Sequence, residues 1–212
     1  MSTLIRLAKE AGKRYELRPL LKEMVRYSNV QGIIRDDKNR EKHAVRFYEA
    51  VKSVKWLNHA PHFWFQYAVA SLAINSIEAS ERYFTVAYAK AKAMPGYFTN
   101  MIDNHYARLL LVKASSSKWS STFFELYTEA KKILDRQAGN FSEKHYPFRV
   151  AAGLEHLMEV HAARMSAPQK SDILAFCQKI VDAAESMPRG LRDHPSVRDC
   201  VVRLNRVLVK EQ

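Results

Sequence analysis

The chain has 212 residues, of which 47% are hydrophobic and 26% charged, with only 6 glycines and 7 prolines. So few turn-forming residues exclude most all-β folds, and the many Ala, Leu, Lys, Glu and Arg residues favour helices. No apolar run reaches 18 residues, so we expect no transmembrane helix, and the N-terminal stretch lacks the apolar core of a secretory signal. Cys177 and Cys200 have no metal-ligand spacing. We therefore expect a reduced, cytoplasmic protein without a cofactor.

Positive charge is concentrated at the two ends of the chain, whose formal net charge is +12. Residues 1–56 hold 14 basic and 7 acidic side chains, residues 189–212 hold 6 and 3, and the middle is nearly neutral. Such ends would attract nucleic acid, an acidic surface on another protein, or a missing part of a larger chain.

Residues 1–58 are expected to form a basic N-terminal region with helices over 3–11, 16–28 and 40–57 and a polar loop over 29–39. Basic side chains recur every four residues opposite the apolar stripe of the second helix, and two more lie largely opposite the apolar face of the third. We take these six as candidate partner-binding residues: Arg14, Arg18, Lys22, Arg26, Lys42 and Arg46. They could follow phosphates or face an acidic protein, or they could simply form solvated helix faces.

Residues 59–212 are expected to form a continuous array of seven further helices. Pro61 and Ser76 mark helix starts, Pro95-Gly96 marks an end, and Pro168 with Ser171 opens another helix. The expected helices span 61–75, 77–94, 98–115, 120–138, 147–165, 171–187 and 195–209. Connections of about 2–8 residues favour antiparallel neighbours.

The helix pair from Phe63 to Met94 has the spacing of a tetratricopeptide unit. The large and small residues that would pack its two helices together are Trp64, Tyr67, Ala68, Phe84 and Ala87. Shifted by 43 residues, Phe84–Ala87 matches Tyr127–Ala130. We therefore predict an all-α fold in which about ten helices form antiparallel pairs stacked as a tetratricopeptide-like solenoid. The alternative is a plain helical bundle.

Three segments carry a family resemblance: FWFQYAVA (Phe63–Ala70), ASERYFTVAYAKA (Ala79–Ala91) and IDNHYARLLL (Ile102–Leu111). They resemble the tetratricopeptide-like module at the C-terminal end of large bacterial defence proteins, where a sirtuin-like or other effector domain precedes a STAND-type NTPase. The resemblance implies a sensing or scaffolding module that recognises a foreign protein or mediates assembly. The chain lacks the phosphate-binding GxxxxGK[ST] motif and a glycine-rich dinucleotide loop, so the resemblance does not extend to ATP-driven signalling.

The densest polar cluster in the sequence runs from Asp103 to Arg108. We expect these residues to belong to the repeat core, where an Asp–Arg or Asn–Arg pair between helices would satisfy buried polar groups; contact with a ligand is the alternative. His59 and His62 flank a proline turn and lack a third metal ligand nearby.

Aromatic residues are numerous, and some near helix ends could line a concave groove. Candidates are Tyr97, Trp119 and Tyr146.

With no catalytic motif visible, we expect a non-catalytic interaction module of a bacterial antiphage defence or signalling assembly. Its partner would be a larger NTPase, an effector subunit or a phage protein. The alternative is a nucleic-acid-binding protein that uses the basic N-terminal helices.

Overall fold

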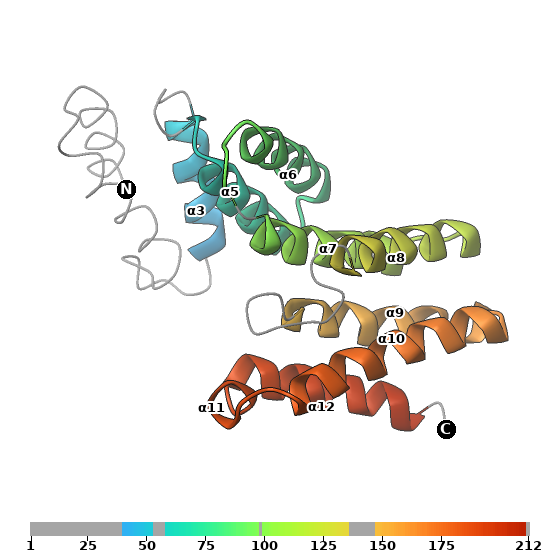
Figure 1. The fold of residues 1–212 in the computed structure, drawn as a ribbon. Coiled ribbons are helices and arrows are strands. Elements are labelled where there is room, and N and C mark those ends of the chain that lie inside the picture. The colour runs from blue at the N-terminus through green and yellow to red at the C-terminus, as the bar shows by residue number, and fades with distance from the viewer. Residues whose placement is uncertain (1–39, 53–57, 98, 136–146, 211–212) are drawn as a thin grey trace. The chain divides into compact units, whose positions relative to one another are not determined.

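A computed structural model describes residues 40–52, 58–97, 99–135 and 147–210 (Figure 1). These ranges are helical and contain no strand, which confirms the all-α prediction for the part of the chain described. The helices expected over 3–11 and 16–28, with Arg14, Arg18, Lys22 and Arg26, lie outside the described residues. The α-helices are α3 (Arg40–Val51), α5 (Pro61–Ala73), α6 (Ile77–Lys92), α7 (Asn100–Ser115), α8 (Ser120–Asp135), α9 (Ala151–His161), α10 (Ala167–Glu185), α11 (Arg189–Arg192) and α12 (Pro195–Lys210), with 3-10 turns η2 (Phe148–Val150) and η3 (Ala162–Arg164).

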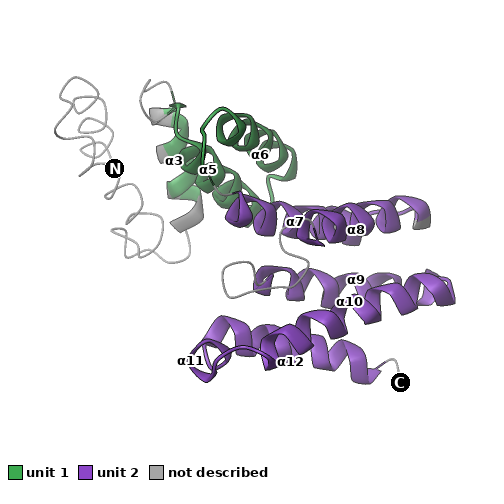
Figure 2. Ribbon diagram, in the orientation of Figure 1, with its two compact units in different colours: residues 1–98 green, residues 99–212 purple. Residues whose placement is uncertain are grey.

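The chain divides into two compact units, residues 1–98 (unit 1) and 99–212 (unit 2) (Figure 2). The division falls after Phe98, whereas the sequence suggested one after residue 58. Within unit 1, α3 packs against α5, so helices on the two sides of residue 58 share a core. A continuous array over residues 59–212 stays a prediction.

Unit 1 is built around a cluster of aromatic rings. α5 is apolar nearly all round because it packs against both α3 and α6. Tyr67 of α5 stacks on Tyr83 of α6 with ring centroids 3.8 Å apart. Tyr48 of α3 meets Phe63 of α5 edge-on at 5.3 Å. Offset and edge-to-face rings add to the free energy of burial, so this cluster joins all three helices.

The turn between α5 and α6 is fixed by its backbone. Asn75 has a left-handed φ of 59°. Its amide donates to the carbonyl of Leu72 (3.0 Å), and the amide of Ser76 donates to the carbonyl of Ser71 (2.9 Å). This is a Schellman motif, which ends a helix by satisfying its last carbonyls. α5 therefore ends at Ala73, and Ser76 occupies the N-cap of α6, as predicted, although its side chain makes no capping hydrogen bond.

Unit 2 contains three layers of helices (Figure 1). α7 and α8 form a hairpin, α7 packs against α9, and α12 packs against both α9 and α10. α7 is buried on nearly every side, including the polar residues Asp103, Asn104 and His105. At the α7–α9 contact, a Cβ added to Gly153 would lie only 2.8 Å from the Cβ of Leu111. Glycine at this position is what allows the two helices to approach so closely.

Two elements near the C-terminus differ from expectation. α10 begins at Ala167 and not at Ser171, because Ser166 and Gln169 form a reciprocal capping box and Pro168 lies in the first turn. The short α11 lies between the helices expected over 171–187 and 195–209, where no helix was predicted. No described helix has both the length and the apolar character needed to cross a membrane.

Candidate functional site

The basic residues predicted to contact a partner are described only in α3. Lys42 and Arg46 lie one turn apart and are both exposed. Arg14, Arg18, Lys22 and Arg26 lie outside the described residues.

Of the residues predicted to form the repeat core, five lie in α5 and α6 and are buried where these two helices pack, whereas Asp103 and Arg108 lie in α7. Trp64, Tyr67, Ala68, Phe84 and Ala87 each have less than a tenth of their surface exposed.

Asp103 and Arg108 lie on the same helix, α7, and are not paired with each other. Asp103 accepts a hydrogen bond from Thr99 Oγ1 at 2.9 Å. Arg108 forms no ion pair with Asp103, and its positive charge contributes to lowering the pKa of His105 and of Arg149. The Asp–Arg or Asn–Arg pairing between helices that the sequence suggested stays a prediction.

Of the aromatic residues expected near helix ends, Trp119 is 74% exposed just before α8. Tyr97 is half-buried, and burial raises its pKa. Tyr146 lies outside the described residues.

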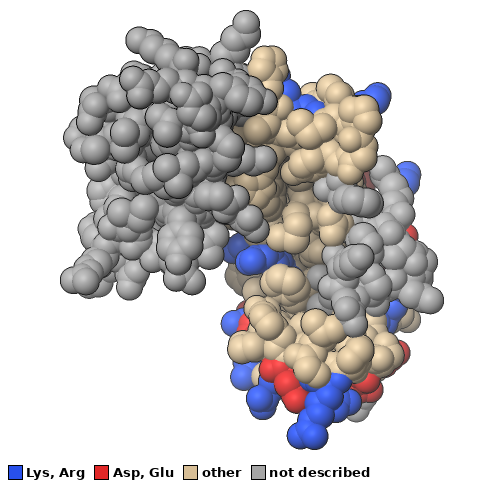
Figure 3. Space-filling model, turned by 60° about the vertical axis from the view of Figure 1, so that its left-hand side comes forward, with Lys and Arg blue, Asp and Glu red and all other residues tan. Residues whose placement is uncertain are grey.

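The basic C-terminal segment is largely neutralised by neighbouring carboxylates. Arg203 Nη1 lies 2.7 Å from Glu155 Oε2, and its Nε lies 3.0 Å from Asp199 Oδ2. Lys210 Nζ lies 3.7 Å from Glu159 Oε1. Figure 3 shows blue and red side chains beside one another at the lower end of the described surface, where α11 and α12 lie in Figure 1. This end of the chain is therefore a mixed surface and not a uniformly basic one.

A groove with a volume of about 560 Å³ lies between α8 and α10. Helical periodicity brings Phe124, Thr128, Lys131 and Asp135 to one side of α8, at intervals of four, three and four residues. Asp172 of α10 closes the other side. The lining residues are Phe124, Thr128, Lys131, Lys132, Asp135 and Asp172.

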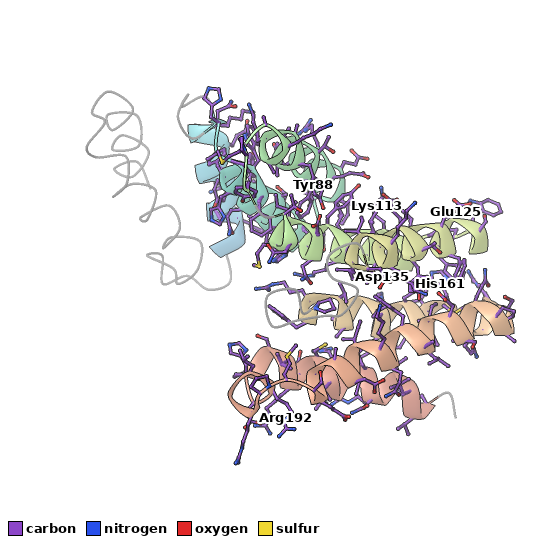
Figure 4. The ribbon with its side chains drawn as sticks, in the orientation of Figure 1. Tyr88, Lys113, Glu125, Asp135, His161 and Arg192 are labelled. Atoms are coloured by element: carbon purple, nitrogen blue, oxygen red, sulfur yellow. The ribbon has the colours of Figure 1, made fainter. Side chains whose placement is uncertain are left out.

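Side chains bridge the two helices along this groove. The buried Tyr127 donates its hydroxyl to Asp172 Oδ2 at 2.9 Å. Lys131 Nζ lies 2.6 Å from Asp172 Oδ1, and Lys179 Nζ lies 2.7 Å from Asp135 Oδ1. Figure 4 labels Asp135 on the α8 side of this junction, and Glu125 on the side of α8 away from α9 and α10. These contacts link α8 to α10 along the groove.

The groove offers binding groups and little acid–base chemistry. Asp172 forms an ion pair with Lys131, and Asp135 forms one with Lys179. Burial, followed by the nearby Asp172, raises the pKa of Tyr127, so its hydroxyl stays protonated. Lys132 forms no ion pair within the described ranges, and Phe124 is partly exposed. A partner can therefore reach one aromatic ring and one ammonium group.

Other reactive side chains in the described part of the chain are shielded. Burial raises the pKa of the Cys177 thiol to about 12, which keeps it protonated and unreactive. His161 is buried at the end of α9, where its ring stacks on Phe123 at 4.5 Å and its Nε2 lies 3.1 Å from the carbonyl oxygen of Ala114. No group of three or more His, Cys, Asp or Glu residues suited to a metal occurs among the described residues, His59 and His62 included.

The sequence did not single out the groove residues, because Lys131 and Asp172 are 41 positions apart. The sequence did contain one indication of the groove. Beside the buried face of α8, a second row of residues recurs at helical spacing, namely Phe124, Thr128, Lys131 and Asp135. No protein-family model, curated protein or solved structure matches this chain.

Proposed function

We propose that the protein is a non-catalytic interaction module, a sensor or scaffold, whose α8–α10 groove receives a segment of a partner protein. The observation that supports this most is the groove itself. Ion pairs and the Tyr127 hydrogen bond link its two walls, and it presents a partly exposed ring and an ammonium group that has no ion-pair partner among the described residues. An aromatic anchor surrounded by polar groups is a common arrangement at protein interfaces.

The partner segment should carry an apolar side chain for Phe124 and an acidic residue for Lys132. The net charge of +12 would attract an acidic segment over long range. Trp119, which is 74% exposed and precedes the first turn of α8, would extend the contact surface at one end. Tryptophan is enriched among residues that contribute most to binding.

The proposed setting follows from the resemblance of residues 63–111 to the helical modules of bacterial defence proteins. The partner would then be a larger NTPase, an effector subunit or a phage protein. The layered packing of α7–α8, α9–α10 and α12 supports a solenoid-like array within unit 2.

A photo-crosslinking amino acid placed at Thr128 in the full chain tests the groove directly. Thr128 is exposed and lines the groove, and Asn205, exposed on α12, is the matched control. We expect Thr128 to give one protein adduct in cells, identified by mass spectrometry, which Asn205 does not give. The exchange Lys132→Glu should lower the yield of that adduct several-fold. Equal adducts at both positions, or none at Thr128, would contradict the proposal.

Nucleic-acid binding is the second candidate, favoured by the exposed Lys42 and Arg46 on one side of α3 and by the net charge. Phosphate contacts release counterions, so such binding must weaken steeply as salt rises. A fluorescence titration of a labelled oligonucleotide at several salt concentrations, with the double exchange Lys42→Gln and Arg46→Gln, tests this. No binding at low salt would exclude it.

A further inference from the structure

A second groove of unit 2 lies between α9 and α12 and has a volume of about 310 Å³. Part of its lining is apolar and comes from Met158, Ala162 and Val207. Met158 and Val207 are almost fully buried, so they form the floor of the groove. The rest of the lining is charged and consists of Glu155, Glu159, Arg206 and Lys210. A small volume with an apolar floor and a few charged groups is typical of sites for small molecules.

The charged side chains are sorted by helix. Glu155 and Glu159 lie four residues apart on α9, and Arg206 and Lys210 lie four residues apart on α12. Residues at this spacing share one side of a helix. The α9 wall of the groove is therefore acidic and the α12 wall is basic.

Opposite charges face each other across the groove at long distances. Arg206 Nη1 lies 3.8 Å from Glu155 Oε1, and Lys210 Nζ lies 3.7 Å from Glu159 Oε1. Both distances exceed the range of about 2.7–3.2 Å for an N–H···O hydrogen bond. Arg203, which does not line the groove, lies only 2.7 Å from Glu155 Oε2.

Three of the four charged groups are free to turn toward a ligand. Arg206, Lys210 and Glu159 each have more than half of their side-chain surface exposed. Glu155 is mostly covered and is held by Arg203. The groove thus offers two adjustable cations, one adjustable carboxylate and an apolar floor.

We infer that this groove binds a free α-amino acid with an aliphatic side chain. The ligand carboxylate accepts hydrogen bonds from Arg206 and Lys210, and its ammonium group donates to Glu159. Charge-assisted hydrogen bonds of this kind are shorter and stronger than the long pairs that they replace. The aliphatic side chain covers Met158 and Val207, which removes apolar surface from water.

The position of the two ligand charges favours an amino acid over a peptide. In a free α-amino acid both groups are attached to one carbon, so they can reach the two walls at once. A peptide carries its two charged ends on different residues. The site is separate from the α8–α10 groove and does not rest on the proposed partner binding.

Calorimetric titration of the full chain with L-leucine tests the inference. We expect alanine to bind at least tenfold more weakly, because its side chain is too short to cover the floor. Leucinamide, which lacks the carboxylate, and 4-methylpentanoate, which lacks the ammonium group, should each lose at least tenfold. A leucine-ended tripeptide that binds more tightly than leucine would show that the groove takes a peptide end, and would overturn the assignment.

Variants of the walls and floor provide the second part of the test. Arg206→Gln and Glu159→Gln should each weaken leucine binding at least tenfold. Ala162→Leu fills the groove without changing its charges and should abolish binding.

Two exposed positions serve as matched controls, since Arg198→Gln on α12 and Glu185→Gln on α10 remove the same charges outside the groove. Both should bind leucine as the wild type does, and circular dichroism checks that every variant is folded. No binding of leucine, or equal binding by the Arg206→Gln, Glu159→Gln and control variants, would overturn the inference.

Discussion

In the described part of unit 1 the large buried side chains are mostly aromatic, whereas in unit 2 they are mostly aliphatic and bordered by ion pairs. Unit 1 joins α3 to α5 through rings and through the Tyr67 hydroxyl, which donates to the Glu49 carboxylate. Unit 2 joins α8 to α10 through Tyr127, Lys131 and their shared partner Asp172. In unit 1 the helices are joined mainly by packed aromatic rings. In unit 2, hydrogen bonds and ion pairs near the surface also join the helices. The groove to which we propose that a partner binds lies in unit 2, between α8 and α10.

The largest expected effect tests the aromatic packing of unit 1. Phe84 is fully buried and lies 6.4 Å from Phe65, measured between ring centres. We expect Phe84→Ala to lower the free energy of unfolding by about 3–5 kcal/mol, measured by urea denaturation. Leu154→Ala, at a fully buried aliphatic position of unit 2, should lower it by about 2–4 kcal/mol. A loss below about 1 kcal/mol for Phe84→Ala would contradict the described packing of α5 on α6.

A smaller effect tests the close α7–α9 contact of unit 2. In Gly153→Ala the new methyl group would lie 2.8 Å from Leu111 Cβ, so one of the helices must shift. We expect a loss of about 2 kcal/mol in the free energy of unfolding, because overpacking a core contact forces backbone movement. Gly190→Ala is the control, since nothing lies within 4 Å of its new Cβ. If both variants unfold alike, the contact is looser than described.

The buried polar residues of α7 predict a pH dependence for unit 2. Burial, with Arg149 and Arg108, lowers the pKa of His105 to about 3, below the value of 6.5 for an exposed histidine. The unfolded chain therefore binds the proton first, and stability that is present above pH 6.5 is lost as the pH falls toward 3. The limiting slope is about 1.4 kcal/mol per pH unit.

His105→Leu should flatten that slope in denaturation curves recorded from pH 7 to 4. His59→Gln, at an exposed position in unit 1, is the control. An unchanged slope in His105→Leu would show that other groups account for the acid sensitivity.

The smallest expected effect concerns the turn between α5 and α6. Asn75 has a φ of 59°, which glycine adopts without strain. Asn75→Gly should therefore change the melting temperature little or raise it slightly, by the equivalent of about 0.5 kcal/mol, and Asn75→Ala should lower stability by about 1 kcal/mol. The reverse order of the two variants would show that the Asn75 side chain matters more than the backbone angle.

Apolar periodicity and helix-breaking residues in the sequence correctly predicted the positions of most of the described helices. Starts at Pro61 and Ile77 and the buried rings of α5 follow from local rules, because proline fixes φ and apolar spacing marks the buried side. The start of α10 was wrong by four residues, because the capping box of Ser166 and Gln169 was not recognised. Local signals of this kind can be found in a sequence.

Contacts between distant residues could not be predicted in the same way. The bridge from Lys131 to Asp172 and the approach of Arg149 to Arg108 depend on how helices pack, and periodicity does not specify which helices become neighbours. The sequence indicated that residues 103–108 were unusual for a helix, but placing Arg108 beside another arginine required the fold.

The missing side chain at Gly153 also has an evolutionary consequence. A related chain with alanine or a larger residue there must either move α9 away from α7 or place glycine opposite, at the position of Leu111. These two positions should therefore change together across relatives. A correlated small residue at one position or the other would help to recognise distant members when little other identity remains.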